Sequence, residues 1–209
     1  MKAYKKYFKH TLDAHFPEQS EPLLSDIETT FHALEGDIRF ASASKNPMDK
    51  RLGIAAYFLA LIKVLEKKGE SYEQIREISL EIARNYVQPK NRFQAMMKRL
   101  PVKLIGTRLS TVLLKYLDRK LSDRGHPEGF VSRIITDKNE TYGLGYGVDI
   151  LECGICKLFA KHNYSPYTSI LCEIDFITTN LAGLQLVRSG TIANGADTCD
   201  FRFKVNQAK

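Results

Sequence analysis

The sequence has no apolar segment long enough to cross a lipid bilayer. Its longest apolar stretch, "GIAAYFLALI" at residues 53–62, falls well short of the roughly 20 residues that a membrane-spanning helix needs. The first residues, "MKAYKKYFKHTLDAHF", carry charge but lack the apolar core of a secretory signal. We therefore expect a cytoplasmic protein without a membrane partner.

The sequence also lacks a dense basic run with interleaved aromatic residues. Residues 129–209 carry eight basic and eight acidic side chains, so the formal net charge of +7 belongs to residues 1–128. There the basic residues mix with acidic ones along helical patterns, which is typical of a solvated helix surface. We expect no nucleic-acid partner.

Internal repeats, low-complexity linkers and long charged tails are missing as well. Hydrophobic residues make up 44% and charged residues 26% of the chain, which is ordinary for a globular protein. We therefore expect residues 1–209 to form one compact unit, with a helical part at 1–125 and an α+β part at 126–209. The composition leaves the oligomeric state open.

Helical periodicity dominates the first part of the chain. Apolar residues recur at helical spacing, and Gly69, the Ser71–Gln74 capping box and Pro89 mark helix ends. The predicted helices cover residues 1–16, 20–42, 48–69, 71–86 and 91–122, the last of them kinked at Pro101.

The apolar period changes after about residue 125. Strands are predicted for "GFVSRIITD" and for "TYGLGYGVDIL", whose three glycines would share one face. Two helices follow, from Cys153 and at 167–181, and then two strands at 183–194 and 198–205. The order β-β-α-α-β-β predicts an α+β fold with a four-stranded antiparallel sheet and helices on one face.

Only four cysteines are present, and in the cytoplasm they would be thiols, metal ligands or catalytic groups rather than disulfides. Cys153 follows a strand and begins a helix, where the helix dipole favours a thiolate, and Glu152 beside it is a candidate base. The alternative is a small buried apolar residue. Cys153 and Cys156 also form a CxxC, which is a zinc half-site if Cys172 and Cys199 complete it, or a redox pair.

Two further residues suggest a polar site. Asp175 lies three residues after Cys172 on one helix face, among apolar neighbours. Arg188 is its natural partner and could also bind a substrate carboxylate. The alternative is a structural Asp–Arg pair. Alternation places Cys199 on the face of the last strand that points toward the helices, where three thiols could converge.

The segments "ECGICKLFAKHN", "CEID" and "LVRSGTIANGADTCDFRFK" together resemble the L-2-amino-thiazoline-4-carboxylic acid hydrolase family, and the resemblance extends back to about residue 50. The C-terminal half is distantly similar to ligand-binding domains related to vinyl reductases. The residues that match the family pattern are Cys153, Cys172, Asp175, Arg188, Gly195, Cys199, Asp200 and Phe201.

The resemblance implies a hydrolase that opens a cyclic amidine bearing a carboxylate. Cys153 would attack the amidine carbon and Asp175 or Glu152 would move protons; in the alternative, an aspartate activates a water for the attack and the thiols are structural. Arg188 would hold the carboxylate, with Cys172, Cys199 and Asp200 around the substrate. No cofactor is expected, although zinc on the four cysteines is possible. The alternative is a small-molecule-binding or metal-binding domain without turnover.

Overall fold

The first half of the chain consists of helices that end near the predicted residues. A computed structural model describes residues 4–105 and 107–206, and only the backbone of 101, 103, 104, 108, 109 and 111. The helices are α1 Lys5–His15, α2 Ser20–Ile38, α3 Leu52–Lys68, α4 Tyr72–Val87, α5 Arg92–Leu104 and α6 Arg108–Ser122, with 3-10 turns at Arg39–Ser42 and Pro47–Arg51.

The predicted stop and start signals between α3 and α4 are confirmed. Gly69 follows α3 with a φ of 93°, which a residue with a side chain rarely adopts. Ser71 and Gln74 then form both hydrogen bonds of the capping box, at 3.2 and 3.0 Å.

The single kinked helix predicted for residues 91–122 is wrong, because the structure has two helices there. Pro101 lies inside α5, and α5 closes with the Ile105 N–H donating to the Val102 carbonyl. Thr107 then starts α6 by accepting the N–H of Ser110 at 3.2 Å. The cap at Thr107, rather than the proline, sets the break.

The second half has the predicted order of elements. The strands are β1 Val131–Ile135, β2 Gly147–Glu152, β3 Leu184–Val187 and β4 Cys199–Val205; the helices are α7 Gly154–Lys161 and α8 Thr168–Leu181, with 3-10 turns at Ser165–Tyr167 and Ile192–Asn194. The four strands form one antiparallel sheet in the order β1-β2-β4-β3. The α+β class is therefore confirmed.

Strand β2 is shorter than predicted, because Gly143 and Gly145 lie in turns and only the third glycine, Gly147, lies in the strand. Tyr142, Gly143 and Gly145 have φ angles of 51°, 81° and 72°, which are incompatible with a strand. The Gly145 N–H donates to the Thr141 hydroxyl at 2.9 Å, so this segment folds back on itself. Pairing in the sheet begins only at Gly147.

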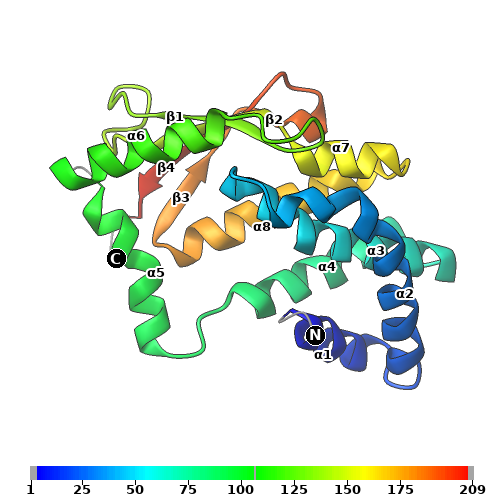
Figure 1. Ribbon diagram of the computed structural model, residues 1–209. Coiled ribbons are helices and arrows are strands. Elements are labelled where there is room, and N and C mark those ends of the chain that lie inside the picture. The colour runs from blue at the N-terminus through cyan, green and yellow to red at the C-terminus, as the bar shows by residue number, and fades with distance from the viewer. Residues whose placement is uncertain (1–3, 106, 207–209) are drawn as a thin grey trace.

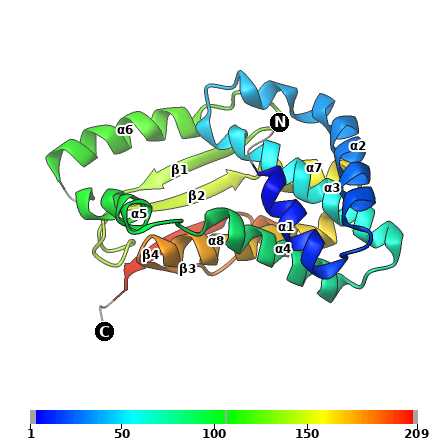
Figure 2. The ribbon, with the colours of Figure 1, turned by 90° about the horizontal axis from the view of Figure 1, so that it is seen from below.

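The helices lie around the sheet in two groups (Figures 1 and 2). Helices α5 and α6 lie at one end of the molecule, and α1–α4 with α7 lie at the other. Helix α6 runs along the edge strand β1, where Asp118 accepts the Ile134 N–H at 2.7 Å. One cluster of buried residues includes Tyr57 of α3 as well as Phe159 of α7 and Cys199 of β4.

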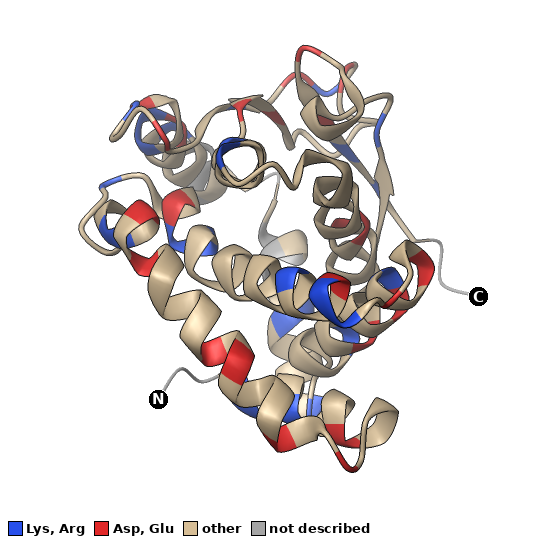
Figure 3. Cartoon of the chain, turned by 90° about the vertical axis from the view of Figure 1, so that its right-hand side faces the viewer, with Lys and Arg blue, Asp and Glu red and all other residues tan. Residues whose placement is uncertain are grey.

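Charged residues of both signs lie along the helices, as Figure 3 shows for the side of α2 and α7. Several pairs connect different elements, such as Lys161 with Asp37 at 2.8 Å and Lys5 with Glu28 at 3.2 Å. Within the ranges that the structure describes, no helix is long and apolar enough to cross a membrane.

A buried polar clasp, formed by Asn46 and Asp49, joins the helical part to the sheet. Both side chains are fully buried. Asp49 accepts the Phe130 N–H at 2.8 Å, and the Asn46 amide donates to the carbonyls of Phe130, Leu121 and Asp123 at 2.9, 3.2 and 3.3 Å. The Asn46 carbonyl oxygen also accepts the Met48 N–H at 3.0 Å. Loss of any of these partners leaves buried polar groups unpaired.

The first prediction concerns this clasp. Asn46→Ala removes the donor to three carbonyls and should lower the free energy of unfolding by about 3 kcal/mol. The exposed Asn139→Ala should change it by less than about 0.5 kcal/mol. Urea denaturation followed by circular dichroism measures both, and equal small effects would show that the clasp is not needed for stability.

Candidate functional site

One cavity of about 50 Å³ lies between the sheet and the helices α7 and α8. Five of the residues predicted from the sequence line it: Cys153, Cys172, Asp175, Arg188 and Cys199. The remaining lining residues are Arg51, Phe130, Ile150, Ile155, Thr168, Leu171 and Phe201. The fold thus brings together three thiols, one acid and two arginines in mostly apolar surroundings. We call this space the thiol cavity.

Cys153 lies at the junction of β2 and α7, where it is the N-cap residue of the helix. The junction is tight, because a Cβ on Gly154 would come to 3.0 Å from the Glu128 carbonyl and 3.1 Å from the Phe130 ring. Hydrogen bonding by the Cys156 thiol, and then by the N–H groups of Cys156 and Ile155, lowers the pKa of Cys153 despite its burial. This environment favours a thiolate.

The other three thiols have environments that favour the protonated form. Burial, followed by the charge of Asp175, raises the pKa of Cys172 to about 12. Burial also raises the pKa of Cys199, although its sulfur accepts the Ile192 N–H at 3.2 Å. The pKa of Cys156 is raised chiefly because its proton is shared with Cys153. Cys153 is therefore the candidate nucleophile among the four.

Asp175 and Arg188 form a partly buried pair, with 3.3 Å between carboxylate and guanidinium. Arg188 also donates to the Cys172 carbonyl at 3.3 Å, and its guanidinium lies 5.1 Å from the ring centres of Phe176 and Phe201. These contacts leave 7% of the Arg188 side chain exposed. Burial nevertheless raises the pKa of Asp175, against the opposing charges of Arg51 and Arg188.

Arg51 is the cavity residue that the sequence did not reveal. It is exposed, it is the N-cap residue of α3, and it has no ion pair among the residues that the structure describes. A cation at a helix N-terminus opposes the helix dipole and adds to the positive potential there. In the sequence, Arg51 looks like any basic residue on a solvated helix. The structure makes it an anion-binding candidate at the thiol cavity.

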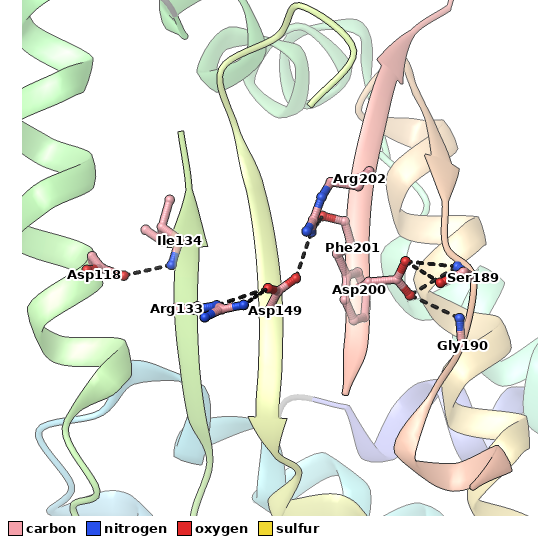
Figure 4. A network of polar contacts seen from close by, with 9 residues as sticks. All are labelled: Asp118, Arg133, Ile134, Asp149, Ser189, Gly190, Asp200, Phe201 and Arg202. Atoms are coloured by element: carbon pink, nitrogen blue, oxygen red, sulfur yellow. Dashed lines mark hydrogen bonds and ion pairs between the residues drawn. The ribbon is translucent and has the colours of Figure 1, made fainter. Parts of the chain in front are cut away.

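Glu152 and Asp200 lie outside this cavity, although the sequence suggested both. The Glu152 carboxylate forms ion pairs with Lys157 and Arg124. Asp200 is on the opposite face of the sheet, where it accepts the N–H groups of Ser189 and Gly190 at 3.0 Å each (Figure 4). Both carboxylates therefore have local structural partners.

Cys156 also lies outside the lining of the thiol cavity, next to Cys153. In the part of the chain with described side chains, no three His, Cys, Asp or Glu residues are arranged to hold a metal ion. The four cysteines are thus not gathered as a group of three or more metal ligands among the described residues, and zinc binding by them stays a prediction.

The second prediction compares two thiols that line the same cavity. Cys153 should react with iodoacetamide at pH 7 at least about tenfold faster than Cys172, because its pKa is lowered and that of Cys172 is about 12. Its rate should reach half-maximum below about pH 8.5, the value of a free thiol. Mass spectrometry of labelled peptides measures both rates. Equal or reversed rates would contradict the assignment of Cys153.

Comparisons with known proteins agree with the resemblance seen in the sequence. The family described as L-2-amino-thiazoline-4-carboxylic acid hydrolase matches residues 50–203, which include Arg51, the sheet except for the last two residues of β4, and every lining residue of the thiol cavity. No curated protein and no solved structure matches the chain. Because the match covers well over half of the sequence, the chain belongs to the L-2-amino-thiazoline-4-carboxylic acid hydrolase family.

Proposed function

We propose that this protein hydrolyses a cyclic amidine that carries a carboxylate, the reaction class for which its family is described. One observation carries the proposal: the single thiol with a lowered pKa opens into the same cavity as an acid with a raised pKa and an exposed arginine. A nucleophile and a proton donor with separated pKa values are what ring opening of an amidine requires.

In the first step the Cys153 thiolate attacks the carbon between sulfur and nitrogen in the thiazoline ring. The new C–S bond forms as the C=N bond gives its electron pair to the ring nitrogen, which takes a proton. The tetrahedral carbon then collapses: a nitrogen lone pair re-forms a C=N bond as the bond to the ring sulfur breaks, and the sulfur leaves as a thiolate. The product is an isothiourea attached to Cys153.

Asp175 is the proton donor in this scheme. Burial raises its pKa, so the carboxyl retains a proton more readily than an exposed aspartate. A protonated amidine is a stronger electrophile than the neutral form, so an acid beside the thiolate favours attack. Hydrogen-bond donors around Cys153 favour its thiolate form. The apolar surroundings of Asp175 favour its protonated form.

The second step releases the product. Water adds to the isothiourea carbon, and the bond to the Cys153 sulfur breaks, so the thiolate is regenerated. The carbon becomes the carbonyl of a urea attached to the opened chain, whose free thiol was the ring sulfur. Asp175, deprotonated after the first step, accepts a proton from the attacking water. The net change is the addition of one water molecule.

Arg51, rather than Arg188, is the better holder of the substrate carboxylate. The sequence favoured Arg188, but its guanidinium is already engaged by Asp175, the Cys172 carbonyl and two aromatic rings. Arg51 lines the same cavity, is exposed, and stands at the positive end of α3. A carboxylate there gains a charge-assisted hydrogen bond without displacing an existing partner.

The third prediction separates turnover from binding. Cys153→Ala should lower kcat for 2-amino-thiazoline-4-carboxylate by at least about 1,000-fold while the ligand still binds. Cys156→Ala removes the thiol that stabilises the thiolate, so its rate profile should move to higher pH with activity recovered there. Steady-state kinetics measures kcat and its pH dependence, and titration calorimetry measures ligand binding. Full turnover by Cys153→Ala would reject the thiol mechanism, and binding without turnover by the unaltered protein would favour a ligand-binding domain.

The fourth prediction tests the carboxylate holder. Arg51→Gln should raise KM about 10- to 100-fold with a smaller change in kcat, because a charged hydrogen bond to the substrate is lost. The exposed Lys45→Gln, which lines no described cavity, is the matched control and should leave KM unchanged. An unchanged KM in Arg51→Gln would return the role to Arg188.

A further inference from the structure

A second, larger cavity adjoins the thiol cavity. It is an open groove of about 400 Å³ between α3, α4 and α8. Most of its lining is apolar, including Ile54, Phe58, Tyr86, Val87 and Ile174. Part of this apolar surface is open to solvent: the Tyr86 side chain, for example, is 41% exposed. Exposed apolar surface gathered in a groove usually marks a binding site.

The two cavities are adjacent. They share Arg51, Ile155, Leu171 and Asp175 as lining residues. Asp175 and Arg51 therefore border both spaces, with the Cys153 thiol in one and the apolar lining of the groove in the other. A ligand whose carboxylate is held by Arg51 has both spaces within reach.

The volumes of the two cavities indicate which part of such a ligand lies in each of them. A cavity of about 150 Å³ encloses a benzene molecule, whereas the thiol cavity measures about 50 Å³. It therefore admits the reacting edge of a small ring, but not a whole five-membered ring with its substituents. The rest of the ligand lies outside this cavity, and on the side of the groove a bare thiazoline carboxylate would cover little of the apolar lining.

We propose that the groove is a second substrate subsite that binds an apolar tail. The ligand class is then an amphipathic carboxylate, with a compact polar head at Arg51 and the thiol cavity and a hydrocarbon or aromatic substituent along α3, α4 and α8. The identity of the reacting head rests on the function proposed above. The tail subsite rests on the groove itself and on Arg51, which lines both cavities.

Linear fatty acids test the subsite without any chemistry. Each methylene buried in the groove contributes about 0.8 kcal/mol, which is about a fourfold gain in affinity. Titration calorimetry with butanoate, hexanoate and octanoate should therefore show a gain of about 15-fold per two carbons, until the groove is filled. Equal affinities along the series in the unaltered protein would overturn the proposal.

A matched pair of variants locates the binding. Thr178 is exposed and lines the groove, whereas Asn180 is exposed on the same helix and does not line it. Thr178→Trp should block the groove and abolish the gain with chain length, but leave the affinity for butanoate within about twofold. Asn180→Trp should keep the full gain. A gain that persists in Thr178→Trp would place the tail elsewhere and overturn the subsite.

The outcome is separable from that of the hydrolase proposal, because the fatty acids measure binding alone. A chain-length gain that Thr178→Trp removes supports the subsite even if Cys153→Ala retains turnover. Hydrolysis of a small thiazoline carboxylate without any chain-length gain supports the hydrolase and removes the subsite.

Discussion

The site depends on the buried clasp of Asn46 and Asp49 on Phe130. Two fully buried polar side chains are costly unless every donor and acceptor is paired, and here two N–H groups and three carbonyls are satisfied. The clasp fixes the turn before α3 against the start of β1. It therefore sets the position of Arg51, two residues after Asp49, and of Phe130, against which the Gly154 backbone packs.

Glycine is required at two points around this clasp. A Cβ on Gly129 would come to 2.7 Å from the Asp49 carboxylate, and one on Gly154 would meet the Phe130 ring at 3.1 Å. Glycine is needed at these two positions because the backbone lies close to the Asp49 carboxylate or the Phe130 ring, and not because of a positive φ angle. Because β2 leads through Glu152 directly to Cys153, the same close packing places the thiol at the cavity.

The helices and strands were predictable because their apolar periods are local properties. The errors occurred where one local pattern fits two structures. The alternating glycines at 143 and 145 were predicted to lie in a strand but make turns. Pro101 was predicted to kink one long helix but lies inside α5, and the helix ends after it. The convergence of Cys153, Cys172 and Cys199 followed from combining strand alternation with helix starts. Arg51 and the clasp were not predictable, since their roles depend on partners about 80 residues or more away.

The two faces of the sheet differ in polarity: the outer face carries the charged side chains, and the inner face is apolar and lines the cavity. On the outer face, Asp149 is held by Arg133 at 2.9 Å and by Arg202 at 2.8 Å, and Asp200 is held by the backbone at Ser189 (Figure 4). Alternation along β2 and β4 then leaves Ile150, Cys199 and Phe201 for the inner face, which lines the cavity.

This apolar inner face gives the few polar groups in the cavity their effect. Charges and hydrogen bonds act more strongly where little water screens them. The Cys156 thiol, and after it the N–H groups at the start of α7, can therefore lower the pKa of Cys153, while burial raises the pKa of Asp175 in the same cavity. The low-polarity wall that the sheet provides is thus the condition under which one thiol and one acid acquire complementary protonation states.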